Sequence, residues 1–293
     1  MIKLGNLELK NRIFLAPMHQ INDVAFRMLC KGAGAGLTYT GLINPQTREK
    51  LYFQDKPALQ FACNSDKGIK EFIKKYDKNI SLYDFNLGCP SPHAKQSKLG
   101  YFMIGDYKKI DEILKTIRKN TKKPLTLKIR KMPDEQTAKI LKIAEKYCDA
   151  ISIHPRTQPQ GYSGIPDLEF ARKIKKKTKL PVIYSGNVNN KEQAEQMLKE
   201  FDFIMIGRSA IGNPSIFSDI LAKNTKKRIN FHDWLKLAKK IIKPLYFNQI
   251  KFQALNFTRD FEGSAKVRNE LSLAKNEKEV LRILRGASLI TDN

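Results

Sequence analysis

The chain has 293 residues with a formal net charge of +25, and hydrophobic residues make up 41% of it. This length allows one large domain and a small one around a sizeable buried core. No apolar run reaches the roughly 18 residues that a membrane span needs, and the N-terminal "MIKLGNLELKNRIF" lacks the apolar segment of a signal peptide. We therefore expect a cytoplasmic protein that does not enter a membrane.

The cysteine pattern and the net charge indicate which covalent links, metals and macromolecular partners the protein would have. Cys30, Cys63, Cys89 and Cys148 form no CxxC pair and no metal-ligand cluster, so neither a disulfide framework nor a metal site is expected. The charge suggests a polyanionic partner, most plausibly nucleic acid. A merely solvated Lys-rich surface is the alternative, and the run "RKIKKKTK" at 172–179 fits the outer face of a helix. No dimerisation motif is evident, so we expect a monomer.

Eight short apolar, β-branched or aromatic runs recur over about the first 210 residues. Most are separated by charged stretches with helical periodicity, such as 106–123 and 190–201. This alternation is typical of buried parallel strands joined by amphipathic crossover helices. Eight such units predict a (β/α)8 TIM barrel, an α/β fold. The expected strands cover 12–18, 37–43, 58–63, 82–88, 125–130, 150–155, 181–186 and 203–207.

A doubly wound open sheet is the main alternative fold. It would be favoured by a G-x-G-x-x-G motif directly after the first strand, and none is present there. The stretch "KGAGAG" at 31–36 precedes the second strand instead, and we interpret it as a turn that ends a helix.

From about Phe231 the pattern becomes helical only. Apolar residues at 234, 235, 238, 241, 242 and 245 form one amphipathic face. We predict a barrel domain over 1–225 and a small all-helical bundle over 231–293. The bundle carries 12 Lys and Arg against 7 Asp and Glu, so most of the positive charge belongs to the barrel. An RNA-binding surface that spans both domains fits this distribution, and a bundle that only caps the barrel is the alternative.

Polar or reactive side chains follow nearly every expected strand. The carboxyl ends of barrel strands carry the active site, so these side chains are expected on one rim. The loops after the seventh and eighth strands, "SGN" at 185–187 and "IGRSAIGN" at 206–213, also contain glycines where barrels commonly bind phosphate. Ordinary turns that need glycine are the alternative there. The rim residues are Pro17, Met18, His19, Gln60, Asn86, Cys89, Lys128, Arg130, His154, Arg156, Ser185, Gly186, Asn187, Gly207 and Arg208.

Six stretches in order along the chain resemble the tRNA-dihydrouridine synthase (Dus) family, flavin-dependent barrels related to dihydroorotate dehydrogenase. The combination of "NxGCP" with a downstream "HxRTxxQxYSG" is highly specific. The chain departs from the family pattern at "HQIND" (19–23), at "KLGYFMIG" (98–105) and at "SGN". The matching stretches are "LAPM" (15–18), "NLGCP" (86–90), "LKIR" (127–130), "IHPRTQPQGYSG" (153–164), "PVIYSGNV" (181–188) and "MIGRSAIGNPSIF" (205–217).

The resemblance implies FMN on the barrel rim and tRNA as the partner. Cys89 would be the catalytic acid, and Asn86 would help to place the uracil. Arg130, Arg156 and Tyr162 would lie on the RNA side of the rim. In the tail, "TRDFEGSAKVRNEL" would face the RNA, with Arg259, Lys266 and Arg268 as candidate phosphate contacts. The residues implied for FMN are Pro17, Met18, His19, Gln60, Lys128, His154, Ser185, Gly186, Asn187, Gly207 and Arg208.

The implied reaction reduces specific uridines in tRNA to 5,6-dihydrouridine, with electrons from NADPH or NADH. Carbon 6 of the uracil would gain a hydride from reduced FMN, because no side chain can supply one. Carbon 5 would gain a proton from Cys89, since a thiol with a reference pKa of about 8.5 is mostly protonated at neutral pH. Lys128 would stabilise negative charge on the reduced ring. A structural, buried cysteine is the alternative for Cys89.

Two other functions compete with this one. A flavin oxidoreductase that acts on a free pyrimidine would need no basic helical appendage, and the charge of +25 argues against it. An RNA-binding protein or chaperone could keep the barrel without catalysis. The presence of Cys89, Lys128 and His154 argues against that reading.

Overall fold

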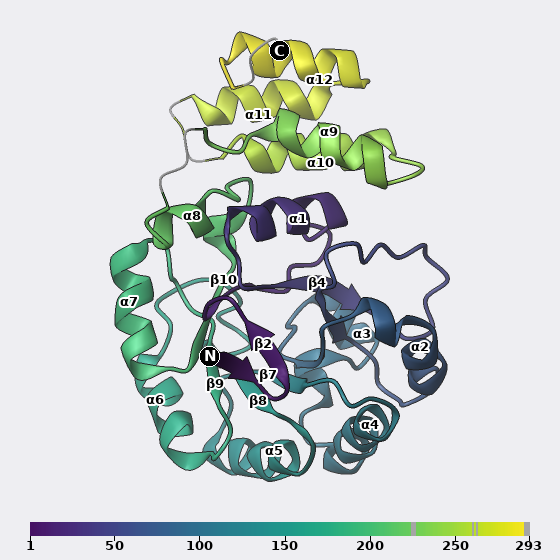
Figure 1. Ribbon diagram of the computed structural model, residues 1–293, viewed down its shortest axis with the longest axis vertical. Coiled ribbons are helices and arrows are strands. Elements are labelled where there is room, and N and C mark those ends of the chain that lie inside the picture. Colours follow the sequence, from purple (N-terminus) through teal and green to yellow (C-terminus); the bar gives the residue numbers. More distant parts are fainter. Residues whose placement is uncertain (224–226, 260, 262, 290–293) are drawn as a thin grey trace.

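The computed structural model describes residues 1–223, 227–259, 261 and 263–289. Eight parallel strands form a closed barrel in the order β10-β3-β4-β5-β6-β7-β8-β9 (Figure 1). The predicted (β/α)8 fold is therefore confirmed, although several strands are shorter than expected. They are β3 (Ile13–Leu15), β4 (Leu37–Ile43), β5 (Ala58–Phe61), β6 (Leu82–Leu87), β7 (Leu125–Arg130), β8 (Ala150–His154), β9 (Val182–Tyr184) and β10 (Phe203–Ile206).

Helices surround the barrel because their apolar stripes pack against the outward-facing strand residues. Gly34 ends the first helix with a φ of +118°, so the predicted turn at 31–36 is confirmed. Residues 44–57, between β4 and β5, contain no helix. The helices are α1 (Val24–Ala33), α2 (Ile69–Tyr76), α3 (Pro92–Gln96), α4 (Tyr107–Asn120), α5 (Asp134–Tyr147), α6 (Leu168–Lys177), α7 (Lys191–Glu200) and α8 (Ile216–Ile220), with short 3-10 turns at Asp77–Asn79, Gly100–Met103 and Arg208–Ala210.

An antiparallel hairpin of β1 (Ile2–Leu4) and β2 (Leu7–Leu9) closes the amino-terminal end of the barrel. Leu4 is fully buried against an interior cluster that includes Phe14 and Phe203, whose rings stack at 5.1 Å. The interior is thus apolar at this end. The opposite, carboxyl-terminal end is the one at which barrels carry their active sites.

Four helices follow the barrel: α9 (Phe231–Ile241), α10 (Phe247–Phe257), α11 (Ser264–Leu273) and α12 (Glu277–Gly286). They form a layer of their own beside α1 and α8 (Figure 1). Asn230 caps α9 in a reciprocal capping box with Asp233, so the first of these helices begins at Phe231. The predicted end of the barrel domain, at 225, lies outside the described residues.

Asp23, the N-cap of α1, joins the helical unit to the barrel. Its buried carboxylate accepts hydrogen bonds from Trp234 Nε1 at 3.1 Å and from Gln253 Nε2 at 2.6 Å. Burial raises the pKa of Asp23, and these hydrogen bonds oppose that rise. A second contact joins Gly212, after β10, to Asn256 in α10. The two backbones are so close that a Cβ on Gly212 would lie 2.0 Å from the Asn256 carbonyl oxygen. The two units are therefore packed directly against each other.

No helix within the described part of the chain is long and apolar enough to cross a membrane.

Candidate active site

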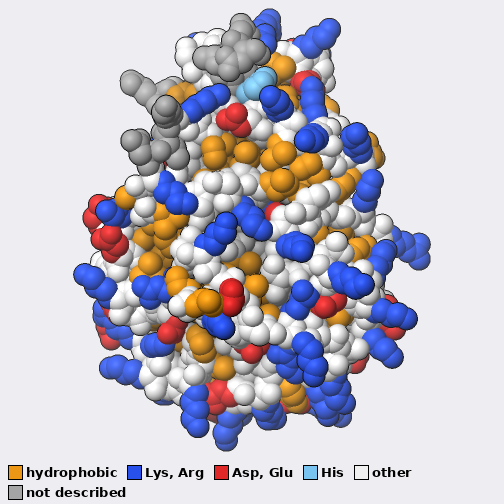
Figure 2. Space-filling view, viewed as in Figure 1, with side chains coloured by type: hydrophobic (Ala, Val, Ile, Leu, Met, Phe, Trp, Pro, Cys, Tyr) orange, Lys and Arg blue, Asp and Glu red, His pale blue; other side chains and the backbone are white. Residues whose placement is uncertain are grey.

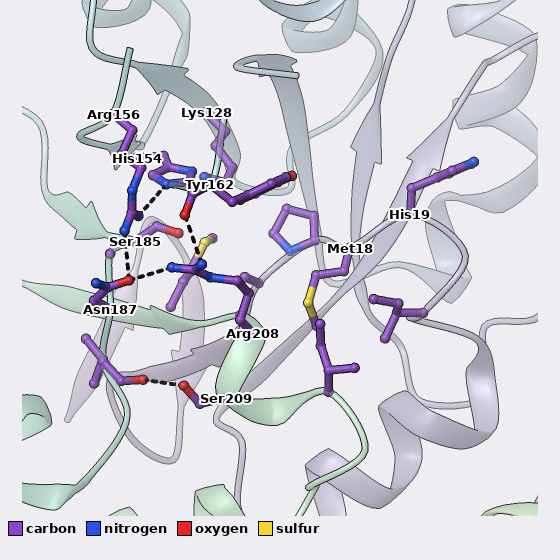
Figure 3. A pocket seen from close by; sticks show the side chains of 18 of the residues that line it. Met18, His19, Lys128, His154, Arg156, Tyr162, Ser185, Asn187, Arg208 and Ser209 are labelled. Carbon is purple, nitrogen blue, oxygen red and sulfur yellow. Dashed lines mark hydrogen bonds between the residues drawn. The ribbon is translucent and has the colours of Figure 1, made fainter. Parts of the chain in front are cut away.

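A cavity of about 410 Å³ opens at the carboxyl-terminal ends of the barrel strands (Figure 3). Parallel strands deliver their carboxyl ends to one rim, so residues far apart in sequence meet there. One wall comes from the helical unit, because Arg259, just after α10, also lines the cavity. The predicted site residues that line it are Pro17, Met18, His19, Gln60, Asn86, Cys89, Lys128, His154, Arg156, Tyr162, Ser185, Gly186, Asn187, Gly207, Arg208 and Arg259.

Cys89 is half-buried on the cavity wall, on the loop after β6. Asn86 Oδ1 accepts hydrogen bonds from the backbone N–H of Gly88 at 3.1 Å and of Cys89 at 2.9 Å, which fixes this turn. The thiol lies 3.4 Å from Ser91 Oγ, and Ser91 caps α3. The loop thus holds the thiol facing the cavity.

The other three cysteines lie away from the cavity. Cys30, Cys63 and Cys148 are buried. Burial raises the pKa of Cys63 to about 12, and it also raises the pKa of Cys30 and Cys148. Buried thiols in such surroundings are inert. Cys89 is therefore the cysteine placed for chemistry.

A chain of polar side chains runs beneath the cavity inside the barrel. Asn86 Nδ2 donates to Gln60 Oε1 at 2.8 Å, and Gln60 Nε2 donates to Asp84 Oδ2 at 2.5 Å. Thr126 Oγ1 donates to the other carboxylate oxygen of Asp84 at 2.5 Å. Sequence analysis missed Asp84. The available signal was its spacing, because a residue two positions before Asn86 on the same strand faces the same side.

Lys128 is a buried cation on the cavity wall, on the strand next to Asp84. Burial lowers the pKa of Lys128, and the negative charge of Asp84 works against this lowering. Burial likewise raises the pKa of Asp84, opposed by the bonds from Gln60 and Thr126 and by the charge of Lys128. Each charge therefore favours the ionised form of the other.

Arg156 and Arg208 meet at Asn187 (Figure 3). Asn187 Oδ1 accepts from Arg156 Nη2 at 2.9 Å and from Arg208 Nη2 at 2.6 Å. Asn187 has a φ of +45°, a left-handed conformation that Asn adopts more readily than most residues. Beside it, a Cβ on Gly186 would lie 2.8 Å from the Tyr184 hydroxyl, so the chain requires glycine there.

His154 is a neutral imidazole in this site. Burial lowers the pKa of His154 to about 2, and the positive charges of Lys128, Arg130, Arg156 and Arg208 add to that effect. Arg156 Nη1 lies 3.1 Å from His154 Nε2. Because a guanidinium can only donate, Nε2 accepts, and the ring proton is on Nδ1.

Arg130 and Arg156 do not occupy the exposed position that we expected for RNA contacts. Arg130 is only 2% exposed and donates to the carbonyl oxygens of Gly88 and Gly161, both at 2.7 Å. Arg156 is 1% exposed and donates to the Gly164 carbonyl oxygen at 2.7 Å. Their guanidinium groups are used to satisfy backbone carbonyls, so they fasten the loop over 157–164 to the rim.

That loop presents Tyr162, whose side chain remains exposed on the cavity edge. The Arg130 guanidinium lies 5.3 Å from the centre of its ring, within the range of a cation–π contact. Arg208 Nη1 donates to the Tyr162 carbonyl oxygen at 2.9 Å. Tyr162 thus lies exposed at the cavity edge, and its contact with RNA stays a prediction.

Three predicted residues lie at the edge of the cavity or beyond it. His19 is exposed and points away from the Arg156 and Arg208 group (Figure 3). Lys266 and Arg268, on α11, do not line the cavity, and Arg268 donates to the Thr258 carbonyl oxygen at 2.9 Å. Lining residues that sequence analysis did not single out are Ala16, Ile21, Leu42, Val188, Asn189, Met205, Ser209 and Ile211.

The charge of the cavity favours an anion. None of the described residues that line it is Asp or Glu, whereas Lys128, Arg156, Arg208 and Arg259 are basic. Arg208 is exposed and is therefore placed to neutralise a phosphate through charge-assisted bonds, whereas Arg156 is buried and donates to backbone carbonyls. Within the described residues, no group of three or more His, Cys, Asp or Glu side chains is placed to hold a metal ion.

Comparison with solved structures supports the fold. Histamine dehydrogenase from Rhizobium sp. 4-9 is similar with a TM-score of 0.59 and 11% identity, over 80% of this chain and 50% of that one. The 6-hydroxypseudooxynicotine amine oxidase of Pseudomonas geniculata N1 is similar with a TM-score of 0.56 and 11% identity, over 75% of this chain and 48% of that one. The chain thus spans about half the length of each, and at this identity only the fold is shared.

Comparison of sequences is more specific. The chain is 31% identical over 236 residues to tRNA-dihydrouridine synthase B of Pasteurella multocida, covering 74% of this chain and 70% of that protein. It is 34% identical over 239 residues to a probable tRNA-dihydrouridine synthase of Rickettsia bellii, covering 75% and 73%. Residues 14–291 match the family of dihydrouridine synthases (Dus). The match spans the barrel and the helical unit alike, and the chain belongs to the dihydrouridine synthase family.

Proposed function

We propose that this protein reduces specific uridines in tRNA to 5,6-dihydrouridine, with FMN in the cavity and NADPH or NADH as the source of electrons. The observation that carries the proposal is that side chains able to bind a flavin and to donate a proton line the same cavity. A presented thiol at Cys89 and a buried cation at Lys128 face the same space as the Arg156 and Arg208 pair. When bound, reduced FMN supplies the hydride that no side chain can give.

The residues present fit FMN. Arg208, Ser185, Asn187 and the glycines of the loops after β9 and β10 would hold the phosphate. Gln60, Lys128 and His154 would bind the polar edge of the flavin or its ribityl chain. Pro17, Met18 and His19 would line the ring from the loop after β3. A cavity of about 410 Å³ is within the range of small-molecule sites.

The protein side of the reaction follows from the groups on the wall. Cys89 Sγ would donate its proton to carbon 5 of the uracil as a positioned general acid. Asn86 holds the Cys89 loop through its Oδ1, and it would help to place the base. Lys128 would stabilise negative charge that develops next to the reacting atoms. A cation does this more strongly in a site with little water than in bulk water.

The assignment of roles to the two units is part of this proposal. Residues 1–225 would bind FMN and carry out the reduction, and residues 231–293 would bind tRNA. Arg259, Lys266 and Arg268 would contact phosphates, and the exposed Tyr162 would meet the RNA at the cavity edge. Lys and Arg side chains are spread over both units, with fewer Asp and Glu between them (Figure 2). A surface that spans both units suits a large polyanion.

The experiment measures dihydrouridine in tRNA and separates the two half-reactions. FMN-loaded wild-type protein with NADPH or NADH should form dihydrouridine in unmodified tRNA and none in free uridine. Cys89→Ala should accept electrons at the wild-type rate but lose oxidation of its reduced flavin by tRNA, by about 10²–10⁴-fold for a missing general acid. The matched control is Cys63→Ala, a buried cysteine outside the cavity. A protein that takes up no FMN, or a Cys89→Ala variant that oxidises at the wild-type rate, would contradict the proposal.

A further inference from the structure

Asp84 is a fully buried carboxylate at the base of the cavity, and it does not line the cavity itself. It lies on β6, two residues before Asn86 and five before Cys89. Both of its oxygens accept short hydrogen bonds, one from Gln60 and one from Thr126. Asp84 does not reach the cavity, but it is hydrogen-bonded to Gln60, which does line it. A buried ionisable group in such a place needs a structural or functional explanation.

We propose that Asp84 is a positioning residue: its carboxylate sets the direction of the hydrogen-bond chain that holds the Cys89 loop, and it supplies the negative charge that faces Lys128. This role for Asp84 depends on the proposed function only in the experiments that measure reduction of uracil. Its structural part, the orientation of Cys89, can be tested on the protein alone.

The direction of the chain follows from what each group can donate. Burial raises the pKa of Asp84 to about 7, so above that pH its carboxylate is ionised and only accepts. Gln60 then presents its Nε2 to Asp84 and its Oε1 to Asn86. Asn86 then presents Nδ2 to Gln60 and Oδ1 to the N–H of Gly88 and Cys89. A single reversal would place two donors against each other. The carboxylate at one end of the chain and the backbone N–H groups at the other end therefore both require the same orientation of the Gln60 and Asn86 amides.

An apolar side chain at position 84 would break this agreement. An amide there would not, because it could accept from Gln60 Nε2 and donate to the Thr126 hydroxyl, which also accepts. The substitution Asp84→Leu removes both acceptors, so Gln60 Nε2 loses its partner. Part of the chain would be left unpaired in a buried place, which costs about 1–3 kcal/mol for each group. The loop that carries Cys89 would lose its fixed hold.

The charge of Asp84 acts on Lys128. The charged groups that bear on Lys128 are Asp84, which favours its protonated form, and Arg130, which opposes it. His154, whose depressed pKa is due in part to Lys128, is neutral and adds no charge. Asp84 is thus the anion that lets a buried lysine stay protonated among arginines.

The test compares Asp84→Leu with Thr126→Val. Both variants remove a hydrogen bond at the same buried position, but Thr126 lies on β7, on the opposite side of β6 from Gln60. The first readout is the rate at which iodoacetamide alkylates Cys89 in the folded protein, located by peptide mass spectrometry. The second is the pH profile of flavin oxidation by tRNA. The third is the free energy of unfolding in urea, which reports general loss of stability.

We expect Asp84→Leu to speed alkylation of Cys89 by about threefold or more and Thr126→Val to change it by less than about twofold, because only the first disturbs the loop. The alkaline limb of the profile should move to lower pH by about one unit in Asp84→Leu, because the anion that favours protonated Lys128 is gone. Equal alkylation rates and coincident pH profiles in Asp84→Leu and wild type would overturn the proposal. So would a Thr126→Val variant that reproduces both changes.

Gln60→Met keeps the test decisive if Asp84→Leu does not fold. It breaks the chain at its second link and retains the charge of Asp84. Faster alkylation with an unmoved alkaline limb is then expected, and a wild-type alkylation rate would contradict the proposal. The two proposals also fail separately: wild-type protein that forms no dihydrouridine would refute the function, while the alkylation rates would still judge the role of Asp84.

Discussion

Gly100 lies directly against Cys89: a Cβ built on Gly100 would be 2.9 Å from the Cys89 Cβ and 2.9 Å from its carbonyl oxygen. Real Cβ atoms do not approach other carbon atoms this closely. Gly100 also has a φ of +57°, a left-handed conformation that L side chains rarely adopt. It belongs to the stretch 98–105, where the chain departs from the family pattern. This stretch therefore forms the back wall that keeps the thiol in place.

Substitution of this glycine should displace the thiol. We expect Gly100→Ala to lower the rate of flavin oxidation by tRNA by about 10²-fold, the effect of moving a reacting group by about 1 Å. The matched control is Gly105→Ala, since Gly105 has a φ of +113° but no atom within 4 Å of a built Cβ. Single-turnover oxidation of the reduced flavin measures both. Equal rates for the two variants would mean that backbone strain, and not contact with Cys89, is responsible.

Removal of the Arg208 guanidinium should weaken FMN binding. A charge-assisted hydrogen bond contributes about 1.5–3 kcal/mol, so Arg208→Ala should raise the FMN dissociation constant by about ten- to a hundredfold. Fluorescence titration of the flavin-free protein measures this. Arg172→Ala is the control, because Arg172 pairs with Glu169 and Glu200 on the outer surface of α6. Unchanged affinity in Arg208→Ala would remove Arg208 from the phosphate site.

His154 should make stability depend on pH. In the folded protein its pKa is about 2, against an ordinary value of 6.5 in the unfolded chain. Between these values only the unfolded chain binds the proton, so stability falls as the pH is lowered, by at most about 1.4 kcal/mol per pH unit. Asp23 and Asp84, whose pKa values are raised by burial, contribute the opposite slope at mildly acidic pH.

The contribution of His154 is isolated by comparing the flavin-free wild type with His154→Gln. Urea unfolding at several pH values between about 4.5 and 7 should show a smaller loss of stability toward acid in the variant. Parallel stability curves would mean that the pKa of His154 is the same in the folded and the unfolded protein, contrary to its buried, arginine-rich surroundings.

Binding of tRNA should weaken steeply with salt, because Lys and Arg contacts release condensed counterions from the phosphates. Arg259→Ala and Lys266→Ala should each lower the affinity and reduce the slope of log K against log salt by about 1. Filter binding between about 50 and 200 mM salt measures the slope. The control is Lys173→Ala, an exposed residue on α6 that pairs with Asp134. An affinity independent of salt would exclude a phosphate interface.

The repeating pattern along the chain determined the barrel and the position of its rim. Alternating apolar runs and amphipathic helices have few ways to bury both faces of a parallel sheet, and closure brings every strand end to the same side. That is why Gln60, Asn86, Lys128 and His154 could be assigned to one cavity from their places at strand ends. The beginning of the helical unit at Phe231 was predictable because the periodicity changes there.

The tertiary structure alone decided how the charges on the rim are used. Arg130 and Arg156 have the sequence context of RNA contacts, but in the fold nearby carbonyl oxygens satisfy them, and both are buried. Asp84 gains its place beneath the cavity from partners on two other strands, and Arg259 reaches the cavity only because α10 packs against Gly212. These outcomes depend on contacts between residues distant along the chain, which local periodicity does not encode because it reports only the face on which a side chain lies.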